Sequence, residues 1–142
     1  MFLTHLPQQA PFRFFDEVIS VDSNNIRGAY TFKKDEYFYQ GHFPGHPVTP
    51  GVILIECMAQ IGLLGLGIQQ MLEKGGDELP PFAFTSSEVD FLKPVYPGER
   101  VEVQAEKVYF RLGKLKVKAR MYNAVGEEVA KGTLSGMMAK EW

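Results

Sequence analysis

The stretch from Gly41 to Leu66 reads GHFPGHPVTPGVILIECMAQIGLLGL, a loop rich in proline and glycine followed by an almost wholly apolar run. The prolines and glycines exclude regular structure up to Pro50, so we expect a stiff loop. The apolar run predicts a helix with Thr49 as its N-cap and Pro50 as its first residue, ending near Glu73. A helix that is apolar all round belongs at the centre of a fold.

The apolar run also has nearly the composition of a short membrane span. It extends over Val52–Ile68, but it carries Glu56, Gln60 and three glycines. The segments on both sides alternate apolar with charged residues, as half-buried strands do. We therefore interpret the run as the core helix of a soluble protein and expect no membrane span.

The composition indicates one soluble domain. A chain of 142 residues that is 45% hydrophobic can bury a core of its own, which predicts a single domain over residues 1–142. The net charge of −2, with scattered Lys and Arg, disfavours nucleic-acid binding. One cysteine, Cys57, excludes an intrachain disulfide, and the N-terminal residues do not resemble a signal peptide. We expect a cytoplasmic protein.

Strand patterns surround the predicted helix. Before it, Phe14–Val21 and Ile26–Phe32 predict a hairpin, and Asp35–Tyr39 predicts one helical turn. After it, four segments alternate with period two: Phe82–Leu92, Val101–Arg111, Leu115–Tyr122 and Glu128–Met138. One helix must cover about six strands, which predicts an α+β fold with a curved antiparallel sheet wrapped around one long central helix. The exposed sheet edges favour a dimer.

Two residues of the opening stretch are suited to acid–base chemistry. Glu56 is the only acid in the apolar run, and loss of water raises the pKa of a carboxyl group and favours a general acid. The alternative is a structural carboxyl group bonded to Gln60, four residues further along the same helix face. His42 lies in the stiff loop and has the pKa range of a general base. Its alternative is a structural histidine held by backbone groups.

Other residues of this stretch admit further interpretations. The N–H of Gly51 is expected at the helix N-terminus, where it can receive a carbonyl oxygen that gains negative charge. His42 and His46 are four residues apart, but Pro44 lies between them and no third ligand is near, so we expect no metal site. Cys57 is interpreted as a small buried apolar residue.

The loop GHFPGHPVTPG, followed by Glu56 in VILIECMAQ, resembles the (3R)-3-hydroxyacyl-acyl carrier protein dehydratases of the FabZ type. The likeness extends to Leu6-Pro7, Pro11-Phe12, Phe38–Gln40 and Phe91–Glu99, and so covers most of the chain. The resemblance implies a hot-dog fold, in which an antiparallel sheet wraps a helix. It agrees with the order of elements predicted from the residues.

The resemblance also implies a reaction, the dehydration of a (3R)-3-hydroxyacyl thioester to a trans-2-enoyl thioester in fatty acid or related acyl-chain biosynthesis. By analogy, His42 removes the C2 proton and Glu56 assists departure of the C3 hydroxyl. The N–H of Gly51 would hold the thioester carbonyl, and Gln60 would orient Glu56. No metal or organic cofactor is implied. The residues expected to line an apolar tunnel for the acyl chain are Phe43, Ile53, Met58 and Phe82.

The partners implied by the resemblance are an acyl carrier protein and a second copy of the chain. The acyl group would be linked to the 4′-phosphopantetheine arm of the carrier, with coenzyme A thioesters as the alternative. In a homodimer, Glu56 of one subunit would face His42 of the other. Three such dimers would make a hexamer.

The chain departs from the usual family pattern at several positions. Gln8-Gln9-Ala10 occupies the place of a His-Arg-Tyr sequence, Asp90 stands where a basic residue is usual, and Phe82 falls near a tunnel-gating tyrosine. These differences indicate a specialised relative that serves a secondary acyl pathway. A hot-dog thioesterase and a catalytically idle, acyl-binding partner subunit remain as alternative functions.

Overall fold

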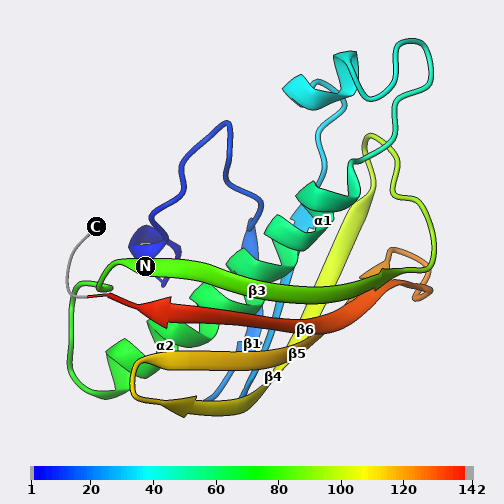
Figure 1. The fold of residues 1–142 in the computed structure, drawn as a ribbon. Coiled ribbons are helices and arrows are strands. Elements are labelled where there is room, and N and C mark those ends of the chain that lie inside the picture. The colour runs from blue at the N-terminus through cyan, green and yellow to red at the C-terminus, as the bar shows by residue number, and fades with distance from the viewer. Residues whose placement is uncertain (1, 140–142) are drawn as a thin grey trace.

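The computed structural model describes residues 2–139, so residue 1 and residues 140–142 of the expected domain lie outside it. One antiparallel sheet with the strand order β1-β2-β4-β5-β6-β3 wraps a long helix, as Figure 1 shows. The strands are β1 (Glu17–Val21), β2 (Asn25–Thr31), β3 (Phe82–Phe91), β4 (Arg100–Arg111), β5 (Lys114–Asn123) and β6 (Glu128–Met138). The predicted α+β architecture is confirmed.

The central helix is continuous but not uniform. It comprises α1 (Gly51–Met58), a π-helical segment η3 (Ala59–Leu64) and α2 (Gly65–Glu73). The helix is long and apolar enough to cross a membrane, yet 78% of its most apolar window is buried inside the protein. It is therefore the core helix around which the sheet closes.

The predicted start of the helix is wrong by one residue. Pro50 is the N-cap, with φ −57° and ψ 137°, and the helix begins at Gly51. Thr49 does not cap it, because its hydroxyl group is hydrogen-bonded to the hydroxyl group of Tyr39. The predicted end at Glu73 is confirmed, with Lys74 as the C-cap and Gly75 at a φ of +76°.

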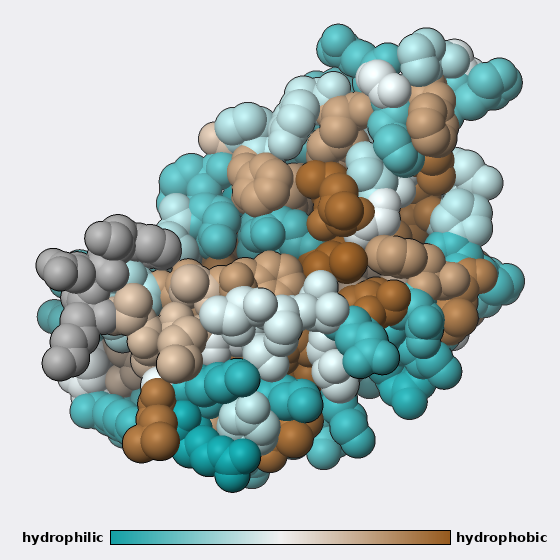
Figure 2. All heavy atoms as spheres, viewed as in Figure 1, coloured by the Kyte–Doolittle hydropathy of each residue, from teal (hydrophilic) through white to brown (hydrophobic). Residues whose placement is uncertain are grey.

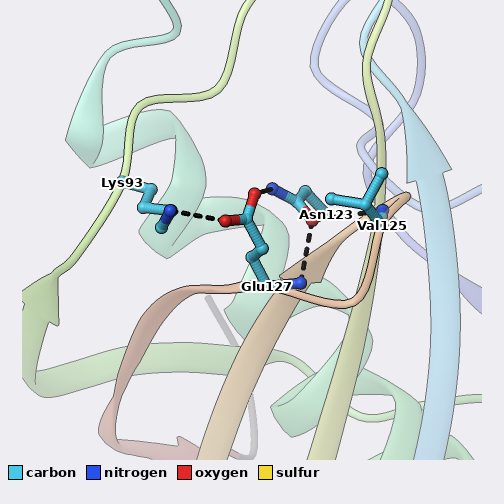
Figure 3. Close-up of polar contacts among 4 residues, drawn as sticks. All are labelled: Lys93, Asn123, Val125 and Glu127. Atoms are coloured by element: carbon cyan, nitrogen blue, oxygen red, sulfur yellow. Dashed lines mark hydrogen bonds and ion pairs between the residues drawn. The ribbon is translucent and has the colours of Figure 1, made fainter.

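The four C-terminal strands agree with their predicted ranges to within one residue at each end. The hairpin turns contain Gly113 and Gly126, both with positive φ, as expected for turn glycines. Figure 3 shows how the β5–β6 turn is held: the Asn123 side chain accepts hydrogen bonds from the N–H groups of Val125 and Glu127. Glu127 also forms an ion pair with Lys93, which ties this turn to the chain that follows β3.

The N-terminal part of the chain differs more from the prediction. Strand β1 begins at Glu17 and not at Phe14, because Phe14 is fully buried and its N–H donates to Gln60 Oε1 instead of to a strand. The expected helical turn is a 3₁₀ helix, η2, over Tyr37–Gln40. A second 3₁₀ helix, η1, occupies Phe2–His5 in a segment expected to be irregular.

The segment between η2 and α1 sets the place of the predicted functional loop. Figure 1 shows this segment rising away from the sheet beyond the N-terminal end of α1. Its base is tied to the body of the fold, because the Thr49 N–H donates to the Val95 carbonyl oxygen at 2.8 Å. The loop therefore projects from the fold while the end that leads into α1 stays anchored.

Candidate functional site

His42 is held in one orientation by the loop that carries it. Its Nδ1 lies 2.9 Å from the Val48 carbonyl oxygen, and the Val48 N–H donates to the His42 carbonyl oxygen at 3.0 Å. A carbonyl oxygen only accepts, so the ring proton of the neutral imidazole is assigned to Nδ1. Nε2 then keeps its lone pair and is free to act as a base.

Phe43 forms one side of the His42 environment. The two rings are stacked with their centroids 4.1 Å apart, and the peptide bond between the two residues is cis. Phe43 is 54% exposed, an unusual position for a large aromatic side chain. The stacked pair therefore presents both an apolar surface and a base to the surroundings of the loop.

Glu56 is a half-buried carboxyl group on the central helix. Burial raises its pKa above the ordinary 4.5, and the hydrogen bond from Gln60 opposes this shift. Its Oε2 accepts that bond from Gln60 Nε2 at 2.8 Å. The raised pKa favours the protonated form, which is the form that a general acid needs.

Gln60 is completely buried and is fixed by three hydrogen bonds. Its Oε1 accepts from the Phe14 N–H at 2.7 Å, and its Nε2 donates to the Phe12 carbonyl oxygen at 2.9 Å as well as to Glu56. Because its oxygen faces a donor and its nitrogen faces two acceptors, the Gln60 amide group can adopt only one orientation. Gln60 therefore joins the segment before β1 to the carboxyl group of Glu56.

We expect the substitution Gln60→Leu to lower the free energy of unfolding by about 2 kcal/mol or more, because it leaves the buried Phe14 N–H and the partly buried Phe12 carbonyl group without their partner. Urea denaturation of the two proteins measures this difference. Gln69→Leu is the matched control, since within residues 2–139 the Gln69 side chain bonds only to Glu73, at an exposed part of the helix. Equal stability losses in the two variants would contradict the expected role of the Gln60 bonds.

The helix that carries Glu56 offers a hydrogen-bond donor at its N-terminus. Within residues 2–139, no group accepts a hydrogen bond from the Gly51 N–H, which is one of the first N–H groups of the helix. A methyl group on Gly51 would lie 2.9 Å from Cζ of Phe91, so a larger residue at this position would require the Phe91 ring to shift. A carbonyl oxygen that gains negative charge is a suitable partner for this N–H.

His42 and Glu56 are each bonded to their own neighbours. No hydrogen bond or ion pair joins them in the described part of the molecule, and the loop bearing His42 rises away from α1 in Figure 1. The described residues also contain no group of three or more His, Cys, Asp or Glu side chains that could hold a metal ion. A base and an acid are thus present, each fixed by its own neighbours.

The residues expected to line a tunnel lie in different parts of the fold. Ile53 and Met58 are packed in the core at 8% and 0% exposure, and Phe82 lies at the start of β3. A hollow of about 890 Å³ lies on the polar outer face of the sheet. Neither it nor two smaller hollows, of about 350 and 400 Å³, include these residues or Phe43. The tunnel therefore stays a prediction.

A contact between two residues at the base of the loop was not predicted from the sequence. Tyr39 and Thr49 are both buried, and their hydroxyl oxygens lie 2.6 Å apart. Tyrosine and threonine are common in loops and strands, and no local pattern links two hydroxyl groups ten residues apart. Only the path of the loop shows that they meet.

Residues 6–133 match the FabA-like domain family. The chain is 37% identical over 132 residues to the 3-hydroxyacyl-[acyl-carrier-protein] dehydratase FabZ of Thermus thermophilus, covering 92% of this chain and 89% of that one. It is 39% identical over 111 residues to the enzyme of the same name from Acinetobacter baylyi, covering 77% and 73% of the two chains.

Solved structures show the same fold at lower identity. The dehydratase heterocomplex ApeI:P from Xenorhabdus doucetiae superposes with a TM-score of 0.81 at 18% identity, covering 97% of this chain and 90% of that one. Protein smu.793 from Streptococcus mutans, bound to acetyl CoA, gives a TM-score of 0.68 at 17% identity, with 96% and 98% covered. At these identities the likeness concerns the fold alone.

Proposed function

Because the chain belongs to the FabA-like family, we propose that it is a hydro-lyase that dehydrates (3R)-3-hydroxyacyl thioesters, carried by an acyl carrier protein, to trans-2-enoyl thioesters. The product belongs to fatty acid or related acyl-chain biosynthesis. The observation that carries the proposal is the fixed ring of His42, which has its Nε2 free for a proton, in the loop that leads into the helix bearing Glu56.

The proposed reaction moves two protons. His42 Nε2 takes the proton from C2, and the negative charge that develops on the thioester oxygen is stabilised by the Gly51 N–H. The electron pair left at C2 forms the double bond to C3 as the C3 hydroxyl departs. Protonated Glu56 gives its proton to that hydroxyl, which leaves as water. Transfer of the C2 proton from His42 back to Glu56, directly or through solvent, restores both groups.

The proposed working form is a dimer in which each site takes His42 from one subunit and Glu56 from the other. The edge strand β3 is largely exposed, and Figure 2 shows apolar side chains gathered over β3 and α1. The exposed large apolar residues of these two elements are Val52, Phe84 and Phe91. Pairing of two β3 edges covers such a surface and extends the sheet. Three such dimers would form the hexamer.

The protein is soluble, in keeping with its buried apolar helix, and we propose the cytoplasm as its location. We also propose that residues 1–142 act as one catalytic domain.

Asp90, exposed on β3, stands where related enzymes usually have a basic residue. It supports a carrier-docking surface that differs from theirs and a role in a specialised acyl pathway.

A direct assay tests the proposed function. The purified protein is incubated with a (3R)-3-hydroxyacyl thioester on an acyl carrier protein and, separately, on coenzyme A, and the products are weighed by mass spectrometry. Loss of one water from the intact thioester is the expected result. Release of the free hydroxy acid would indicate a thioesterase instead. Binding of the acyl chain without turnover on either carrier would indicate a non-catalytic partner subunit.

A further inference from the structure

The hydroxyl groups of Tyr39 and Thr49 meet at the stem of the loop that carries His42. Their oxygens are 2.6 Å apart, and the two residues are only 6% and 5% exposed. Water therefore does not compete for this hydrogen bond. Tyr39 lies in η2, before the loop, and Thr49 lies just before the N-cap of α1. Their bond closes residues 40–48 into a ring, although neither side chain takes part in the proposed chemistry.

Beyond this pair, further hydrogen bonds join the two sides of the loop. Next to it, Val48 and His42 are joined by a backbone bond of 3.0 Å and by the bond of 2.9 Å from Nδ1 to the Val48 carbonyl. At the tip, Phe43 and His46 exchange two backbone bonds of 3.3 and 2.9 Å. Because Val48 is covalently joined to Thr49, any shift of Thr49 moves the carbonyl group that orients the His42 ring.

Both members of the pair are also anchored in the body of the protein. The Thr49 N–H donates to the carbonyl of Val95, which is completely buried. Tyr39 belongs to the buried core cluster, and its neighbour Phe38 packs against the core residue Phe14 with ring centroids 6.1 Å apart. The hydrogen bond between the two hydroxyl groups therefore fixes the base of the projecting loop relative to the core.

We propose that the Tyr39–Thr49 hydroxyl pair positions His42 by holding the Val48 carbonyl where it fixes the ring proton on Nδ1. Without this bond the stem can open, the carbonyl can move away, and the neutral imidazole can exchange its proton between the two nitrogens. Nε2 would then lack its lone pair for part of the time. The kinetic consequence rests on the proposed function, whereas the state of the ring depends only on the geometry.

The kinetic test uses Tyr39→Phe, Thr49→Val and the double variant. We expect each single change to lower kcat about 10-fold, because small misplacements of a reacting group are costly, with KM changed less than about two-fold. The double variant should be no slower than the slower single variant, since both changes remove one bond. Wild-type kcat in both single variants would overturn the proposal.

Two controls separate positioning from general damage to the fold. Tyr37→Phe makes the same change in the same 3₁₀ helix at a residue that is 50% exposed, and it should match the wild type. Thr49→Ser keeps the hydroxyl group and should restore most of kcat. If Thr49→Ser is as slow as Thr49→Val, the hydroxyl bond is not what holds the loop, and the proposal fails.

Nitrogen-15 NMR of the His42 ring tests the same idea without any turnover. At a pH where the ring is neutral, the wild type should show one tautomer, protonated on Nδ1, and Tyr39→Phe should show a mixture. A single unchanged tautomer in Tyr39→Phe would refute the positioning role, even if the wild type is an active dehydratase. A wild type without dehydratase activity would refute the proposed function, and the ring spectra would still decide the role of the pair.

Discussion

Replacing His42 with alanine is expected to lower kcat by about 10²–10⁴-fold, the usual contribution of a positioned general base. The change removes Nε2, the atom proposed to accept the C2 proton, and the ring contact that it removes is with Phe43, which is exposed. KM should change little, since the ring is proposed to act on the reacting proton and not to hold the acyl chain. Steady-state kinetics of dehydration measure both quantities.

His46 supplies the matched control for this prediction. It lies in the same loop, is exposed, and is joined to Phe43 at the loop tip by two backbone hydrogen bonds. His46→Ala should therefore keep the wild-type kcat. Turnover of His42→Ala within a few-fold of the wild type would rule out His42 as the base.

Substituting glutamine for Glu56 should reduce kcat by a similar factor, about 10²–10⁴-fold. Glutamine has nearly the same shape and can still accept the hydrogen bond from Gln60, but it has no proton of an acid to give to the departing hydroxyl group. The fold should be preserved, as near-identical circular dichroism and melting temperature would show. Undiminished turnover in Glu56→Gln would remove Glu56 from the mechanism.

The pH dependence offers a second test of Glu56. Its acid form must be present, so kcat/KM should fall as the pH rises through its pKa. Burial raises that pKa above 4.5, and activity should therefore extend to higher pH than an ordinary carboxyl group would allow.

The same raised pKa makes stability depend on pH, because the folded state holds the Glu56 proton more tightly than the unfolded chain does. The contribution of Glu56 to stability is thus complete below 4.5 and is lost as the pH rises through the raised pKa. Glu56→Gln should lack both effects.

Mixing the two inactive variants tests the shared site. A dimer of one His42→Ala chain and one Glu56→Gln chain has one site with both substitutions and one with neither, if each site draws on two subunits. Unfolding and refolding an equal mixture should therefore recover about a quarter of the wild-type activity, because about half of the dimers are mixed. A site contained in a single chain predicts no recovery at all.

The C-terminal half of the fold was predictable because its pattern is local. Strand β5, expected over Leu115–Tyr122, occupies Lys114–Asn123, and its inward residues alternate with charged ones from Lys114 to Met121. The N-terminal strand was less predictable. Phenylalanine is common in strands, but the Phe14 N–H donates to the Gln60 side chain and not to a neighbouring strand. The π-helical turn over Ala59–Leu64 has no distinct sequence signal, because the same residues suit an α-helix.

In the candidate site, too, some residues could be predicted from local sequence patterns and others could not. His42 and Glu56 could be singled out because a histidine in a stiff loop and one acid in an apolar run are visible in the sequence. The contact between Gln60 and Glu56 follows from their spacing on a helix. The Tyr39–Thr49 pair could not be predicted, since it depends on the three-dimensional path of the loop between them.

The strand order has a consequence for how the chain folds. Strands β4, β5 and β6 pair with their neighbours in sequence, whereas β2 pairs with β4 although the entire helix and β3 lie between them in the chain. Closing long loops costs entropy, so we expect the β4–β6 meander to form early and the N-terminal hairpin to join it late. The loop that bears His42 connects β2 to the helix. The newly made chain should therefore acquire its catalytic geometry only in the last steps of folding.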